Sequence, residues 1–234
     1  MTACADRESA VRIRPAGVDD VAGLTELAGV VATLPLLLRY GARAERLVQD
    51  LVRLACAQSD LAGTIDPARG TAHVAGASTA LPQGSELLLV AEGLLDTDGD
   101  ADGDIAGDTG EDVDADGDRR SALLGFARVQ LGSDPSSGHF GRGGYLRLIA
   151  LRPQLHGRGV GSHLLGAVEA AVQRRHPDLF LLTSDFNVGA QRFYERAGYC
   201  RVGALPDFVH AGITELIYWK RLLAPIAPSQ SRPS

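Results

Sequence analysis

The chain has 234 residues, of which 45% are hydrophobic and 22% charged, an ordinary composition for a globular protein with a buried core. Its net charge of −6 is uneven, because residues 96–118 hold 11 acidic and no basic side chains, while the remainder carries 23 basic and 18 acidic ones. This mildly basic remainder suits a phosphorylated small ligand and excludes a typical nucleic-acid-binding composition. No apolar run reaches the ~20 residues that span a bilayer, and the first ten residues lack the apolar stretch of a secretory signal. Three scattered cysteines argue against a disulfide framework, so we expect a cytoplasmic protein without membrane contact.

The first half of the chain is predicted to contain strands and two amphipathic helices. Strands are indicated by alternating or continuous apolar residues, and helices by apolar residues at a spacing of three and four. The predicted segments are a strand at Val11–Arg14 that ends at Pro15, a helix from Asp19 that Pro35 breaks, a helix from about Ala42 to Ala57, a loop at Ser59–Gly84, and strands at Glu86–Glu92 and Leu123–Leu131.

The second half shows a clearer alternation of strands and helices. The predicted segments are a loop at Ser133–Gly144, a buried strand at Tyr145–Leu151, a helix from Gly161 to Pro177, a strand at Leu179–Leu182, a helix from Asn187 to its C-cap Gly198, strands at Tyr199–Leu205 and Ile213–Arg221, and a disordered tail from Ala224. The strand-helix-strand order around Tyr145–Leu182 predicts a β-α-β crossover with parallel pairing.

A glycine-rich turn, His156-Gly157-Arg158-Gly159-Val160-Gly161, lies between a buried strand and an amphipathic helix. Glycines allow a tight turn and close approach of a ligand to backbone N–H groups, and the helix N-terminus adds its unpaired donors. The turn lacks the Gly-Lys-Ser/Thr of a P-loop and the Gly-x-Gly-x-x-Gly of a dinucleotide fold. It therefore predicts a pyrophosphate-binding site of another kind.

At this turn the sequence resembles the GNAT superfamily of acetyl-CoA-dependent N-acetyltransferases. The family pattern Gln/Arg-x-x-Gly-x-Gly/Ala is matched from His156 to Gly161, with His in the first position. The resemblance implies that Ile149, Ala150 and Leu151 present backbone groups to the pantetheine arm of acetyl-CoA. It implies further that the backbone binds the pyrophosphate from Gly157, Arg158, Gly159, Val160, Gly161 and Ser162.

A second block, Asn187 to Tyr199, is similar to the family pattern Asn-x-x-Ala-x-x-x-Tyr-Glu-x-x-Gly-Phe, with Tyr199 in place of Phe. The resemblance implies that Asn187 bonds the pantetheine arm and that Tyr194 is the general acid. A phenol is protonated at neutral pH and can donate to a forming thiolate. The alternative is that Tyr194 is a core aromatic beside Phe193.

The general base is not identified by the sequence. Related N-terminal acetyltransferases often place a Glu on the fifth strand, where this chain has Leu182. Candidates are Asp185, Glu215 and His210, or a water held by backbone carbonyls. The turn histidines His156 and His163 are interpreted as solvent or phosphate contacts.

The acidic block contains two Asp-x-Asp-x-Asp-Gly segments that resemble half of an EF-hand loop, at Asp98–Gly103 and Asp112–Gly117. The bidentate Glu is missing, because position twelve is Thr109 or Leu123, and no helices flank the segments. We therefore interpret residues 96–118 as a solvated, disordered insertion without a metal site, and the alternative is weak, millimolar binding of calcium.

Together these observations predict one N-acetyltransferase domain over residues 1–223, followed by a tail at 224–234. The expected fold is α/β, a mixed twisted sheet of six to seven strands with helices on both faces and splayed central strands that hold the cofactor. The expected function is transfer of an acetyl group from acetyl-CoA to a primary amine of a small molecule or peptide. The alternative is an acyl-CoA-binding sensor or regulatory module without turnover. The acceptor is expected to contact the first two helices, the Ser59–Gly84 loop and the final strands, and the expected partners include no nucleic acid and allow a homodimer.

Overall fold

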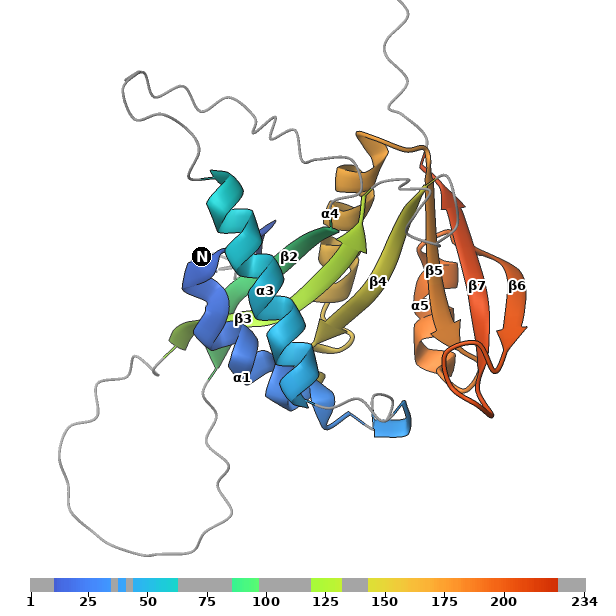
Figure 1. Cartoon of the computed structure of the whole chain (residues 1–234), viewed down its shortest axis with the longest axis horizontal. Helices are drawn as coiled ribbons and strands as arrows, with labels where there is room; N and C mark the ends of the chain where they lie inside the picture. The colour runs from blue at the N-terminus through green and yellow to red at the C-terminus, as the bar shows by residue number, and fades with distance from the viewer. Residues whose placement is uncertain are drawn as a thin grey trace, which may run out of the picture.

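A single mixed sheet of seven strands forms the centre of the protein, in the order β1-β2-β3-β4-β5-β7-β6 (Figure 1). The computed structural model describes residues 11–34, 38–40, 44–62, 86–96, 119–131 and 143–222. Its strands are β1 (Arg12–Pro15), β2 (Glu86–Asp96), β3 (Arg119–Gln130), β4 (Gly144–Leu151), β5 (Asp178–Ser184), β6 (Cys200–Pro206) and β7 (Thr214–Arg221). Strands β4 and β5 pair in parallel, and the other described neighbours pair antiparallel, so the predicted α/β fold with a mixed sheet is confirmed.

Helices cover both faces of this sheet. On one face, α1 (Val21–Ala32) and α3 (Ala44–Ala62) pack on β2 and β3 around the buried side chains of Leu24, Leu51 and Phe126. On the other face, α4 (Val160–Gln173) and α5 (Val188–Arg196) contribute to a second cluster that spans the sheet from β2 to β7. Figure 1 shows α1 and α3 over the first strands only, so neither of these two helices covers β5, β7 or β6.

Two predicted boundaries in the first half are wrong. The expected loop at Ser59–Gly84 begins as helix, because α3 continues to Ala62. The side chain of Gln58 ties this last turn to the sheet, since it accepts a hydrogen bond from the Leu88 N–H at 2.6 Å and donates to the Ala16 carbonyl at 2.8 Å. The rest of that loop lies outside the described residues.

The acidic insertion is also shorter than expected at its start. Strand β2 extends past Glu92 to Asp96, which pairs in register with Arg119 at the beginning of β3. Opposite charges at paired positions favour a longer ladder. The insertion therefore connects two adjacent antiparallel strands, and its residues 97–118 lie outside the described ones.

Strands β4 and β5 separate after a short parallel contact. Only three residue pairs join them, from Gly144↔Leu179 to Leu146↔Leu181, although β4 runs on to Leu151. At the same place Arg147 has no partner in the β3–β4 register, because Leu146 pairs with Val129 and Leu148 with Arg128. An extra residue of this kind is a β-bulge, which bends its strand and increases the local twist. The bulge at Arg147 thus accounts for the fork between β4 and β5.

Candidate functional site

The edge of β4 that borders the fork offers unpaired backbone groups. The Arg152 N–H donates to the Leu124 carbonyl at 2.9 Å, so the 124–152 position is a hydrogen-bonded pair of the β3–β4 ladder. Such pairs alternate with non-bonded pairs along an antiparallel ladder, and Ala150 therefore also bonds to β3. The backbone N–H and C=O groups of Ile149 and Leu151 point the other way, toward the fork. Three residues are expected to present backbone groups to the cofactor. The N–H and C=O groups of Ile149 and Leu151 are free of the β3–β4 ladder, whereas those of Ala150 are bonded within it.

The end of β4 is anchored by a buried arginine. Arg152 is only 5% exposed, and its guanidinium donates to the Leu123 carbonyl at 2.8 Å and to Glu26 on α1 at 2.7 Å. Both bonds are charge-assisted and satisfy a cation that burial would otherwise destabilise. Arg152 consequently fixes the chain immediately before the glycine-rich turn.

The glycine-rich turn has the backbone conformation that its residues predict. Gly157 and Gly159 adopt φ of +78° and +82°, and Gly159 is the N-cap of α4. These are left-handed conformations that other L-residues adopt only with strain. A Cβ atom added at either glycine would meet no other atom within 4 Å. The turn therefore leaves an open space beside its backbone, where a ligand can approach closely.

Four N–H groups of this turn have no acceptor among the described residues, those of Gly157, Gly159, Val160 and Gly161. The remaining two predicted pyrophosphate donors are engaged, because the Arg158 N–H donates to Leu155 at 3.3 Å and the Ser162 N–H to Gly159 at 3.0 Å. Free N–H groups at a helix N-terminus favour an anion. The open space and the free donors together fit a pyrophosphate.

Helix α5 starts at the expected place, at the far side of the fork. The side-chain oxygen of its N-cap Asn187 accepts a hydrogen bond from the Ala190 N–H at 3.2 Å. Capping of this kind uses only the oxygen of the amide. The amide nitrogen of Asn187 makes no hydrogen bond to a described residue, so the residue expected to bond the pantetheine arm keeps a donor available.

Tyr194 on α5 is 6% exposed and belongs to the core cluster beside Tyr199 and Tyr218, with ring centroids 5.7 and 6.2 Å away. Its hydroxyl makes no hydrogen bond with the described residues. Burial raises the pKa of Tyr194 above its usual value, and the neighbouring Tyr145 adds to the effect, so the hydroxyl keeps its proton at neutral pH. The ring of Tyr194 therefore packs in the core, and its hydroxyl is still available to donate a hydrogen bond.

Comparison with known families identifies this arrangement. Residues 101–199, which include β4, the glycine-rich turn and α5, match the model of the Acetyltransferase (GNAT) family. The chain carries a GNAT acetyltransferase domain. The resemblance seen in the sequence is thereby confirmed, and the family supports acetyl transfer as the general reaction.

Solved structures share the fold of this GNAT domain along nearly the whole chain. A GNAT-family protein from Desulfovibrio desulfuricans superposes with a TM-score of 0.56 at 19% identity, covering 92% of this chain and 100% of its own. An N-acetyltransferase from Staphylococcus aureus gives 0.52 at 12% identity, with 92% and 100% covered, and Ard1 from Thermoplasma volcanium gives 0.51 at 16%, with 92% and 99% covered. At these identities the likeness establishes the fold. No curated protein sequence matches the chain.

The candidate bases of the GNAT domain lie in three different environments. Asp185 is exposed just beyond β5, and His210 is exposed in the turn between β6 and β7, with its Nδ1 2.8 Å from the Ala211 carbonyl oxygen. Glu215 is only 2% exposed, on β7 directly across from Ser184 of β5. Among the three, Glu215 is the one that the fold encloses.

Tyr40, which no sequence motif marks, contacts this glutamate. Its hydroxyl donates to Oε1 of Glu215 at 2.5 Å, although the two residues are 175 positions apart. Tyr40 follows the helix-breaking Pro35 in a stretch without a periodic pattern, and its role depends on a contact that only the tertiary structure creates. The sole earlier signal was the expectation that the first two helices contact the acceptor.

The described residues contain neither a cluster of metal-ligating side chains nor a helix that could span a membrane. No group of three or more His, Cys, Asp or Glu side chains there is arranged to hold a metal ion. No helix in these ranges has the length and apolarity required to cross a bilayer.

Proposed function

We propose that this protein transfers the acetyl group of acetyl-CoA to a primary amine of a small molecule or peptide, with Tyr194 as the general acid. The observation that carries the proposal is the continuous set of free donors that borders the fork. It runs from Ile149 and Leu151 on β4 to the four N–H groups of the glycine-rich turn. Bound acetyl-CoA would supply an acetyl group activated as a thioester.

The free edge of β4 would bind the pantetheine amides in the way an added strand pairs with a sheet edge. The glycine-rich turn would bind the pyrophosphate through its N–H groups and the positive end of the α4 dipole. The residues present therefore fit this cosubstrate, because a side chain at Gly157 or Gly159 would occupy the space in which its phosphates must lie.

The reaction also needs a donor for the carbonyl oxygen and a proton for the sulfur. The Ile149 N–H faces the fork and is the backbone donor available for the oxygen. Tyr194 retains its proton at neutral pH because burial raises its pKa, so its hydroxyl can donate to the sulfur as negative charge develops there. The expected cytoplasmic location and the homodimer stay predictions.

The test is the replacement Tyr194→Phe. We expect kcat to fall by roughly ten- to a thousandfold, since general acid catalysis is usually worth about that much. The dissociation constant of acetyl-CoA should stay within about twofold, because the ring still packs. The assay follows release of free thiol from acetyl-CoA with a panel of phenethylamine, spermidine and a tetrapeptide with a free N-terminus, alongside calorimetry.

Tyr199→Phe is the matched control. Its hydroxyl is buried without a hydrogen-bond partner in the described part of the chain, and removing it takes the same atom from the neighbouring ring. Wild-type kcat in Tyr194→Phe would leave Tyr194 as a core aromatic. Binding of acetyl-CoA by the wild type without thiol release for any panel amine would instead favour an acyl-CoA sensor.

A further inference from the structure

Glu215 is a buried carboxylate without a cation. It is 2% exposed, and within the described ranges no Arg, Lys or His makes an ion pair with it. Its hydrogen bond from Tyr40 occupies Oε1, and Oε2 accepts none from a described residue. A carboxylate enclosed in this way is costly unless a positive group or further donors reach it.

A second buried polar group lies beside it. Ser184 is 1% exposed, and its hydroxyl lies close enough to Tyr40 to lower the pKa of that phenol but forms no well-aligned hydrogen bond with a described residue. Ser184 and Glu215 occupy paired positions on β5 and β7, so their side chains leave the sheet on the same face. A buried hydroxyl without a well-aligned partner is rare in native proteins, and this one lies directly across the sheet from the buried carboxylate of Glu215.

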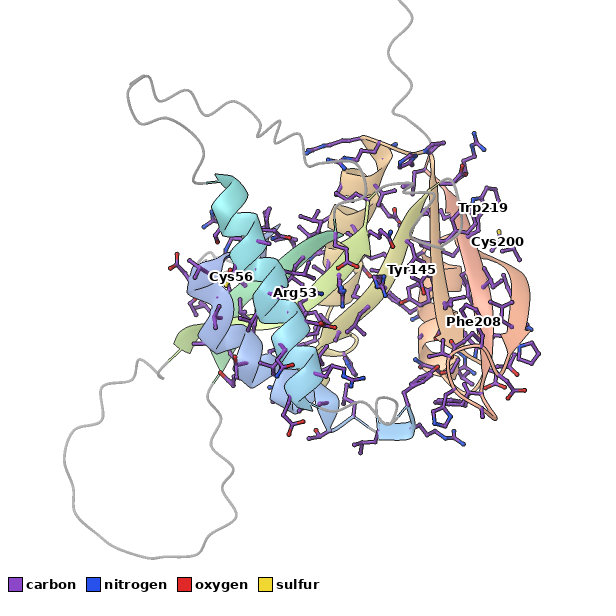
Figure 2. All side chains as sticks on the ribbon, viewed as in Figure 1. Arg53, Cys56, Tyr145, Cys200, Phe208 and Trp219 are labelled. Carbon is purple, nitrogen blue, oxygen red and sulfur yellow. The ribbon has the colours of Figure 1, made fainter. Side chains whose placement is uncertain are left out.

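These groups lie on the face that α1 and α3 leave uncovered, next to the fork. The negative charge of Glu215 acts on Tyr145, whose pKa is raised by burial and by this carboxylate against the lowering effect of Arg147. Tyr145 belongs to the short stretch where β4 still pairs with β5, and Figure 2 labels it on β4 beside the opening. Tyr145 also contributes, after burial, to the raised pKa of Tyr194. Glu215 and the proposed acid therefore lie near the same fork, with Tyr145 coupled to both.

The neighbouring charged groups favour a cation in this place. Burial and the bond to Glu215 raise the pKa of Tyr40 to about 12, and the Ser184 hydroxyl opposes this rise, so Tyr40 stays a neutral donor at physiological pH. Asp185 adds a second negative charge nearby. The guanidinium of Arg39, the residue before Tyr40, stacks on the Phe186 ring at 4.2 Å and forms no ion pair with the glutamate.

We propose that Glu215, held by Tyr40, binds the ammonium group of the acceptor together with Ser184 and accepts its proton. The inference rests on the proposed function and names Glu215 as the base for that reaction. A primary ammonium has three N–H donors. Glu215 Oε2, the Ser184 oxygen and the Tyr40 oxygen provide three acceptors, so the substrate class is a primary amine that arrives as a cation.

The proton balance is as follows. The ammonium nitrogen gives one proton to Oε2 of Glu215, and its freed electron pair forms the C–N bond to the thioester carbon. The C–S bond breaks, its electron pair stays on sulfur, and the sulfur takes the proton of Tyr194. The second proton lost from nitrogen as the amide forms restores Tyr194, and Glu215 releases its proton to solvent.

The test compares Glu215→Gln and Tyr40→Phe with Asp19→Asn, an exposed residue before α1 that undergoes the same change of charge. The panel amine with the highest kcat/KM in the wild type serves as acceptor, from pH 6 to 10. We expect Glu215→Gln to lower kcat/KM for the amine at pH 7 by about 10²- to 10⁴-fold, while the dissociation constant of acetyl-CoA stays within about twofold. This loss should shrink as the pH approaches the pKa of the amine, because more of it is then neutral. We expect a loss of about tenfold for Tyr40→Phe, which removes one hydrogen bond to a charged group, and no change for Asp19→Asn.

Wild-type kcat/KM in a folded Glu215→Gln variant would overturn the inference and leave the proposed function intact. A loss that does not vary with pH would also overturn the role of Glu215 as base. If Glu215→Gln does not fold, Tyr40→Phe decides, since an unchanged kcat/KM for the amine would refute the site. A wild-type protein that binds acetyl-CoA and acetylates no panel amine would refute the proposed function itself.

Discussion

Replacing Gly159 by Ala should weaken CoA binding by one to two orders of magnitude while changing stability only moderately. Gly159 is the N-cap of α4 and has φ +82°. A Cβ atom added there would meet no other protein atom within 4 Å. The added methyl group therefore clashes with nothing in the free protein. It occupies the space in which the pyrophosphate would meet the free N–H groups of the turn.

The two effects can be estimated separately. A left-handed conformation costs a non-glycine residue roughly 1–2 kcal/mol, which lowers the free energy of unfolding by that amount. Holding the phosphate away from one charge-assisted hydrogen bond costs roughly 1.5–3 kcal/mol, or about a 10- to 150-fold increase in the dissociation constant of CoA. Calorimetric titration with CoA measures the second quantity and chemical denaturation the first.

Gly212→Ala is the matched control for this experiment. Gly212 has φ +80°, and a Cβ there would also meet nothing within 4 Å, but it lies in the turn between β6 and β7. It should lose the same stability and keep the affinity of the wild type for CoA. If both variants bind CoA like the wild type, the glycine-rich turn does not hold the pyrophosphate. If both lose affinity equally, backbone strain rather than the space beside Gly159 explains the loss.

Two further predictions concern stability. Gly125→Ala should destabilise the protein by about 1–3 kcal/mol, or roughly 2–12 °C in Tm, because its Cβ would overlap Leu151 and approach the Ala150 carbonyl oxygen to 2.7 Å. Gly29→Ala in α1 is the control, because a Cβ there meets nothing within 4 Å, and this variant should raise Tm. An equal change of Tm in both variants would contradict the packing argument. Burial alone would raise the pKa of Asp20, but hydrogen bonds from Arg14 and the Gly17 N–H lower it overall, so its contribution to stability is present above about pH 4 and is lost at lower pH. The difference in Tm between wild type and Asp20→Asn should narrow between pH 7 and pH 3, and a constant difference would exclude this ionisation as its cause.

Much of the fold follows from local sequence signals. The elements around the glycine-rich turn were predicted to within a few residues, because continuous apolar strands, glycines and caps act over short distances there. The end of α3 was misplaced because the bond between Gln58 and Leu88 joins residues 30 positions apart. The ends of β2 and β3 were misplaced because charged residues paired across strands carry no apolar periodicity.

The same difference between local and long-range signals applies to the residues of the candidate site. The turn glycines and Tyr194 were selected from contiguous motifs, and their roles stay predictions that the free donors and the unbonded hydroxyl support. The bulge at Arg147 and the contact between Tyr40 and Glu215 have no local signal. A bulge is defined by the register of two strands, and the contact by the packing of a segment between two helices against a strand near the end of the chain.

The short contact between β4 and β5 also has a mechanical consequence. Three residue pairs are all that join the β1–β4 half of the sheet to the β5-β7-β6 half along this seam. A ligand that pairs with β4 on one side and contacts α5 on the other would hold the two halves of the sheet together. We therefore expect the two halves of the sheet to separate first at this seam when force is applied to the free protein. A bound cosubstrate should increase the rigidity of the protein most at the same place.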